Sequence, residues 1–184
     1  IGIIYKQLQK YNNAIDYFNR ALSITEEIGN QKGKAKVLNN IGNTFFYLGK
    51  ISNDSVRTEY IKKAIEYYKE TEKIKINLND INSLSSTYTN IGNAYSLMNK
   101  PYDAIEYYNK SLSLLEAMED KYSLASVHQY IAENYYKMAK SLNLSDSLRN
   151  QFWKLCVENG NKSYELAFET GSLPLQVDIS RTLL

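Results

Sequence analysis

The stretch Asn90-Ile91-Gly92-Asn93-Ala94-Tyr95 decides the fold, because altered copies of it occur at three other places in the chain. In each copy a small residue is followed three positions later by an aromatic one. The small residues are Gly2, Gly42, Gly92 and Ala132, and the aromatic residues are Tyr5, Phe45, Tyr95 and Tyr135. Self-similarity at a fixed spacing is the sequence signature of a repeat protein.

A second motif, Ala-Ile-Asp/Glu followed by two aromatic residues, fixes the repeat length. It begins at Ala14, Ala64 and Ala104, with a degraded copy at Cys156. Each of the three alanines precedes the next small residue of the first motif by 28 residues. The step from Gly92 to Ala104 is 12 residues, and the step from Gly42 to Ala64 is 22. The unit is therefore 40 residues, with insertions of about 10 and 12 residues in alternate copies.

Both motifs have the apolar spacing of helices rather than strands. Ile41, Phe45 and Leu48 recur at helical intervals, and no segment alternates like a strand. Only 8 glycines and 2 prolines occur in 184 residues, which favours long helices. We predict helices near 1–9, 11–28, 31–48, 54–77, 81–98, 101–118, 121–140, 146–170 and 173–184. Turns are expected between them, including one at Gly49-Lys50.

We expect one array over 1–184, with the repeats divided as follows. A partial first repeat covers 1–30, a second covers 31–80 with an insertion at 51–60, and a third covers 81–120. A fourth covers 121–172 with an insertion at 141–152, and 173–184 begins a fifth repeat or forms a capping helix. The chain starts at Ile1, without an initiator Met, so we interpret it as an internal fragment of a longer protein.

These residues resemble the tetratricopeptide repeat family. The resemblance rests on the apolar-Gly pair, the aromatic residue after it, the alanine that opens the second helix, and the aromatic four positions later (Phe18, Tyr68, Tyr108). The family's usual unit has 34 residues, and the 40-residue unit is similar to longer variants in bacterial signalling proteins. The resemblance implies an all-α solenoid of antiparallel helix pairs forming a right-handed superhelix.

The composition argues against catalysis and cofactor binding. One cysteine and one histidine leave little for metal or triad chemistry, so we expect no enzyme, cofactor or metal site. We expect His128 to pack or to form a local hydrogen bond, and Cys156 to act as a small buried apolar residue. The formal charge of +2 is too small and too mixed to indicate nucleic acid, and no apolar run is long enough to insert into a membrane. Lys32, Lys34, Lys36, Lys62 and Lys63 form at most a basic corner, which we interpret as a solvated face.

The resemblance points to a protein or peptide ligand, because the first helices of such repeats line a concave groove. By register, the outward positions there are Asn39, Asn43, Thr89, Asn93, Gln129 and Glu133. An asparagine side chain both donates and accepts, so a ladder of them suits a peptide backbone. Local capping by these asparagines is the alternative. Repeats that clamp a terminal carboxylate place Lys or Arg at such slots, and this sequence has none there.

The two insertions offer a second surface. Their apolar residues could form a contact edge, namely Val56, Tyr60, Leu148, Phe152 and Trp153. The alternative, which we favour, is that they pack on neighbouring helix ends such as Tyr47, Leu48 and Met138.

We therefore expect a non-catalytic module that binds protein or peptide. The resemblance suggests the sensory or scaffolding segment of a larger bacterial signalling protein, with a histidine kinase or a transcription regulator as its output. The alternative is a structural module that self-associates into a homo-oligomer through exposed helix ends. Both a cytoplasmic and a periplasmic location are compatible with the sequence.

Overall fold

The computed structural model describes residues 1–141 and 143–172, and these are all-α. They form eight helices: α1 (Gly2–Gln7), α2 (Tyr11–Glu27), α3 (Gln31–Ile51), α4 (Asp54–Asn77), α5 (Ile81–Leu97), α6 (Pro101–Ala117), α7 (Lys121–Ala139) and α8 (Asp146–Glu169). Each agrees with its predicted range to within three residues at either end. The helix predicted over 173–184 lies outside the described residues.

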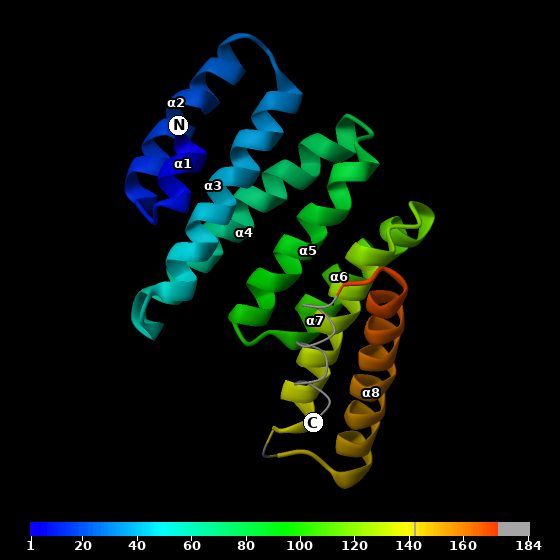
Figure 1. The fold of residues 1–184 in the computed structure, drawn as a ribbon. Helices are drawn as coiled ribbons and strands as arrows, with labels where there is room; N and C mark the ends of the chain where they lie inside the picture. The colour runs from blue at the N-terminus through cyan, green and yellow to red at the C-terminus, as the bar shows by residue number, and fades with distance from the viewer. Residues whose placement is uncertain (142, 173–184) are drawn as a thin grey trace. The chain divides into compact units, whose positions relative to one another are not determined.

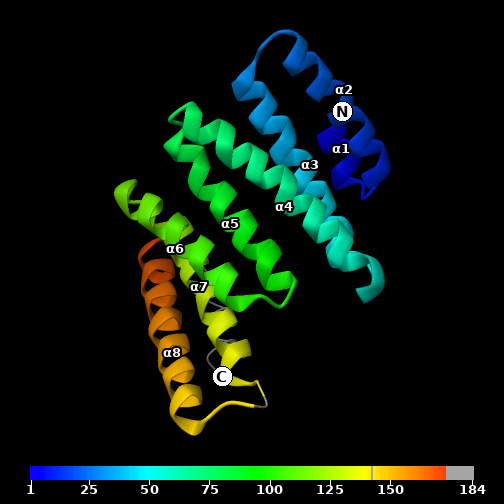
Figure 2. The same cartoon turned by 180° about the vertical axis from the view of Figure 1, so that it is seen from behind.

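The chain divides into two compact units, Ile1–Met98 and Asn99–Leu184. In the first unit, α1 packs on α2, α3 on both α2 and α4, and α5 on both α4 and α3. In the second, α7 packs on α6 and α8. Figures 1 and 2 show α3 beside α4, and α7 beside α8, from opposite sides. The antiparallel helix pairs are confirmed, while the superhelical hand and the repeat boundaries stay predictions.

Small residues let paired helices approach closely, as the repeat motif predicts. A Cβ atom added at Gly42 of α3 would lie 2.6 Å from Cε1 of Tyr68 on α4. The same relationship recurs between Gly2 and Phe18, where the distance would be 2.8 Å. In both pairs an aromatic ring occupies the space that a side chain would need, so glycine sets how near the two backbones come.

Helices α3, α5 and α7 begin with the same local hydrogen bond. The side chains of Asn30, Asp80 and Asp120 each accept from the backbone N–H three residues later, in α3, α5 and α7. Such N-caps satisfy one of the free donors at a helix start. A left-handed residue stands just before each cap: Gly29 (φ 67°), Asn79 (φ 52°) and Glu119 (φ 53°). The chain therefore reverses in the same way before α3, α5 and α7.

The turn predicted at Gly49-Lys50 was wrong, because α3 continues to Ile51. Gly49 is buried, and a Cβ added to it would lie 2.5 Å from Cδ1 of Ile61 on α4. This glycine serves a close helix contact and not a chain reversal. The first insertion, 51–60, thus lengthens both members of the α3–α4 pair.

Candidate functional site

The outward residues of α3 and α5 come together on one side of the first unit. Asn90 Nδ2 donates to Asn39 Oδ1 at 3.4 Å, which links the two helices. The hydroxyl of Tyr68 donates to Asn43 Oδ1 at 2.7 Å from α4 behind them. Thr89 is turned toward its own helix, since its hydroxyl donates to the Ser85 carbonyl at 3.2 Å. The asparagines of this face are therefore held by contacts between helices and not only by local caps.

A cavity of about 220 Å³ opens beside the Asn39–Asn90 contact, toward the C-terminal ends of α3 and α5. It is lined by Lys6, Asn43, Phe46, Tyr47, Tyr68, Asn90 and Asn93. Two predicted residues, Asn43 and Asn93, thus share one wall with aromatic side chains. Burial raises the pKa of Tyr68, so its hydroxyl stays a donor. The cavity thus combines amide groups with aromatic side chains, and ligand sites commonly place a few polar groups beside apolar surface.

A second cavity, of about 470 Å³, lies toward the N-terminal ends of the same helices. Its lining residues are Lys32, Ala35, Lys36, Asn39, Asn40, Lys75, Asp80, Asn82 and Ser83. Because Asn39 lines this cavity and bonds Asn90, which lines the first, the two cavities flank one asparagine contact. We call this pair of cavities the α3–α5 groove. The sequence analysis did not predict the aromatic and lysine residues that line the groove, some of which belong to α1 and α4.

The predicted basic corner is divided among different contacts. Lys34 forms ion pairs with Glu26 at 2.9 Å and with Glu70 at 3.1 Å, and these raise its pKa. Lys63 is paired with Glu59 at 2.7 Å. Lys32 and Lys36, one helical turn apart, line the larger cavity instead.

In the second unit, the two predicted residues of α7 bond each other. Gln129 Nε2 donates to Glu133 Oε1 at 3.1 Å, and both residues belong to one helix face. The structure thus brings together the predicted residues of α3 and α5, and separately those of α7. That all six line one concave face stays a prediction.

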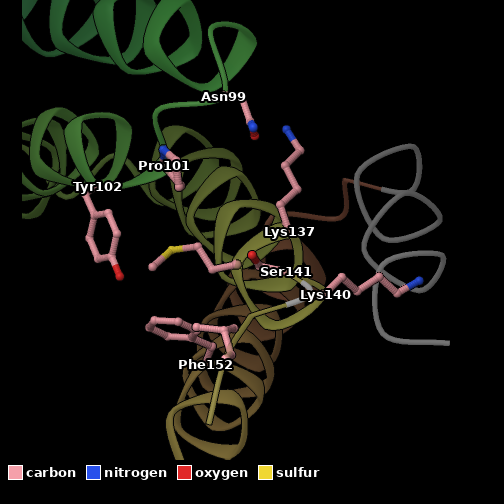
Figure 3. A pocket seen from close by; sticks show the side chains of 9 residues that line it. Asn99, Pro101, Tyr102, Lys137, Lys140, Ser141 and Phe152 are labelled. Atoms are coloured by element: carbon pink, nitrogen blue, oxygen red, sulfur yellow. The ribbon is translucent and has the colours of Figure 1, made fainter.

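The second unit has a cavity of its own, of about 440 Å³. It is lined by residues from the start of α6, the C-terminal end of α7 and the N-terminal half of α8. Figure 3 shows Tyr102 and Phe152 facing it, with Lys137 near Asn99 at its rim. Lys140 points away in Figure 3, and its Nζ lies 4.5 Å from the ring centre of Tyr136. The lining of this cavity is mixed: Pro101, Met138 and Leu144 add apolar surface, and Ser141 adds a polar group.

The residues of the predicted contact edge divide into inward and outward ones. Tyr60 stacks on Phe45 at 6.3 Å between ring centres, and Phe152 on Tyr135 at 6.2 Å. Phe152 is buried, and Leu148 is half-buried. Val56 and Trp153 remain the outward ones, at 39% and 37% exposed. Since the five residues lie in two units, a common edge stays a prediction.

His128 and Cys156 have the structural places that their patterns predict. His128 Nδ1 and Asn159 Oδ1 are 2.9 Å apart, and burial is the main cause that lowers the His128 pKa. Cys156 is buried, which raises its thiol pKa. Among residues 1–141 and 143–172, no group of three or more His, Cys, Asp or Glu side chains could hold a metal ion. None of the described helices has the length and apolar run needed to cross a bilayer.

Comparison with known proteins identifies the repeats. Two tetratricopeptide repeat models match the sequence, one over residues 1–52 and one over residues 85–116. A search of the curated proteins finds no match.

Two solved structures match this chain, and the likeness of fold rests on the first of them. One is a signal transduction ATPase with numerous domains and a tetratricopeptide repeat sensor, from Pyrococcus horikoshii, at 16% identity and a TM-score of 0.62. The match covers 94% of this chain but only 26% of that one. The MamA protein matches at 15% identity with a TM-score of 0.35, over 85% of this chain and 93% of its own.

Proposed function

We propose that this chain, which belongs to the tetratricopeptide repeat family, binds a peptide segment of another protein in the α3–α5 groove. Repeats of this family are protein-interaction modules. The observation that carries the proposal is the wall of the smaller cavity, where Asn43, Asn90 and Asn93 lie beside Phe46 and Tyr47. The amides would bond a peptide backbone, and the rings would cover one apolar side chain.

At the level of the whole protein, we propose a sensory or scaffolding segment of a signalling protein. The support is the tetratricopeptide repeat sensor of the Pyrococcus ATPase, whose fold this chain resembles. A histidine kinase or a transcription regulator remains our proposed output. The chain's own role there is non-catalytic binding.

The test uses a displayed peptide library selected on the 184-residue chain. Peptides that bind are synthesised and titrated against an Asn43→Ala/Asn93→Ala variant, for which we expect about tenfold weaker binding. The matched control is Asn12→Ala/Asn13→Ala, which removes two exposed amides from α2. Undiminished affinity in the groove variant, with circular dichroism unchanged in both, would contradict the proposal.

Self-association is the second candidate function, and exposed apolar residues on α8 favour it. Trp153, Val157, Tyr164 and Phe168 are spaced to share one helix face and are between 37% and 68% exposed. Sedimentation velocity over a hundredfold concentration range decides it. A dimer lost in Val157→Lys/Phe168→Lys supports self-association, whereas a monomer at every concentration rules it out.

A further inference from the structure

The pair Asn159-Gly160, in the middle of α8, has a chemical property that sets it apart in this chain. It is the one place in the 184 residues where glycine follows asparagine. Because glycine has no Cβ atom, its backbone nitrogen approaches the side-chain carbonyl carbon of the asparagine with the least steric hindrance. Attack by that nitrogen releases the side-chain amide as ammonia. In an unfolded chain this pair is therefore the asparagine site most prone to deamidation.

The repeat register shows that the pair departs from the other copies. At the corresponding positions the other copies have two aromatic residues, which carry no amide: Tyr17-Phe18, Tyr67-Tyr68 and Tyr107-Tyr108. The same copy has Ala132 where the others have glycine, so it lacks both partners of the usual glycine–aromatic contact. Gly160 is nevertheless buried. A reactive pair thus stands where the other repeats place inert rings, and its lifetime depends on the helix around it.

The structure restrains the Asn159 amide in three ways. Its Nδ2 donates to the Leu155 carbonyl at 2.9 Å, and its Oδ1 lies 2.9 Å from Nδ1 of His128 on α7. Both residues of the pair are inside α8, where backbone N–H groups are used in the helical hydrogen bonds. The Gly160 nitrogen can reach the side-chain carbon only if the helix opens there, so the folded α7–α8 pair protects the site.

We propose that Asn159 is a deamidation site that reacts when α8 opens locally, and that the reaction leaves a carboxylate against His128. The Gly160 nitrogen bonds to Cγ of Asn159, the bond from Cγ to Nδ2 breaks, and the nitrogen's proton leaves with the ammonia. Water then opens the cyclic imide at either carbonyl, without any change of oxidation state. One product keeps the normal main chain, and the other lengthens it by one carbon atom, which a regular helix cannot accommodate. The reaction is thus an irreversible record of opening.

The product with the normal main chain changes the charge beside His128. Burial is now the main cause that lowers the His128 pKa, and the bond to Asn159 raises it. The charged groups that act on the ring are Lys162 of α8, which lowers the pKa, and Glu116 of α6, which raises it. A carboxylate in place of the amide would favour the charged imidazole and raise the pKa further. Because His128 is the only histidine, its ring signals are assigned without ambiguity.

The first test measures deamidation of the 184-residue chain in mildly alkaline buffer, with and without urea, by peptide mass spectrometry. We expect Asn159 to convert at least about tenfold more slowly in the folded chain than in urea. Asn161 is the internal control, since it is exposed on the same helix but is followed by Lys162. In urea it should convert much more slowly than Asn159, and Gly160→Ala should remove that difference.

The second test follows the His128 ring by NMR as the pH is changed. Asn159→Asp should raise the pKa of His128, because it puts the carboxylate where the amide oxygen stood. The matched control, Asn161→Asp, adds the same charge to an exposed position on α8 and should raise the pKa less. The first test needs no variant at Asn159, so it decides the inference even if Asn159→Asp does not fold.

Any of three results would overturn the inference: equal conversion of Asn159 in the folded chain and in urea, equal conversion of Asn159 and Asn161 in urea, or an unchanged His128 pKa in folded Asn159→Asp. The inference is independent of the proposed peptide binding, because the α3–α5 groove belongs to the other compact unit. Failure of either leaves the other standing.

Discussion

The ring of Tyr68 lies against the backbone of Gly42, while its hydroxyl donates to the side chain of the next residue, Asn43, at 2.7 Å. One tyrosine thus fills the space left by the repeat's glycine and orients a residue of the α3–α5 groove. Packing in the helix pair and the geometry of the candidate site are therefore coupled.

Gly42→Ala should destabilise the chain by about 1–3 kcal/mol, because the new methyl group would meet the Tyr68 ring and lie 3.3 Å from the Ala64 carbonyl. At an unconstrained helical site the same change stabilises by about 1 kcal/mol. The sign of the change in unfolding free energy, measured with urea, therefore decides whether the Tyr68 ring leaves room for a side chain at this position. A gain in stability would show that Tyr68 does not press on Gly42.

Tyr68→Phe should cost about 1 kcal/mol, the net contribution of one hydrogen bond. The ring remains, so the packing against Gly42 is kept and only the bond to Asn43 is lost. Thermal unfolding measures the cost. Tyr67→Phe, on the half-buried neighbour, is the control and should cost less.

Glu119→Gly should stabilise the chain by about 0.5–1 kcal/mol. Glu119 has φ 53° between α6 and α7, a conformation that glycine adopts without steric cost. Glu116→Gly, in the last turn of α6, should instead destabilise by up to about 1 kcal/mol. Opposite signs in chemical denaturation would establish the left-handed turn, and equal losses would refute it.

The stability of the chain should fall in mild acid because of His128. Burial, the largest cause, lowers its pKa below the ordinary 6.5, while its bond to Asn159 raises it. Between the folded pKa and 6.5 the unfolded chain holds a proton that the folded chain does not. The histidine's contribution is therefore complete above 6.5 and declines as the pH falls through that window.

The comparison is with His128→Gln, which keeps a polar group beside Asn159 but does not titrate. As the pH is lowered from about 7.5 to about 5, the unfolding free energy of the wild type should fall relative to that of this variant. A difference that is constant across this range would show that His128 has the same pKa in both states.

The sequence predicted the helices well, because the positions that set them are local. Caps such as Asp80 and positive-φ residues such as Asn79 act on the nearest turn, and both are visible as residue types. Gly49 was misinterpreted because its role depends on a residue of another helix, which the local sequence does not reveal. A glycine that ends a helix and a glycine that admits Ile61 from another helix look alike without the partner.

The candidate site could be derived from the sequence only in part. Asn39 and Asn43 followed from the repeat register, but the lysine cavity did not, since Lys75 belongs to the second helix of its pair. Its spacing from Lys32 in the sequence carries no signal. Only the packing of α4 against α5 brings its ammonium group to Ser83 and Thr87.

The recurring caps at Asn30, Asp80 and Asp120 have a consequence for how such a chain can change its length. Each of these helix starts is specified by the cap residue and the three residues after it, and it needs no contact with another helix. Residues 80–119 run from one cap to the position before the next. If that stretch were duplicated or excised, the helix after every junction would still have its own N-cap. The chain can therefore gain or lose 40 residues at this place without losing a helix start.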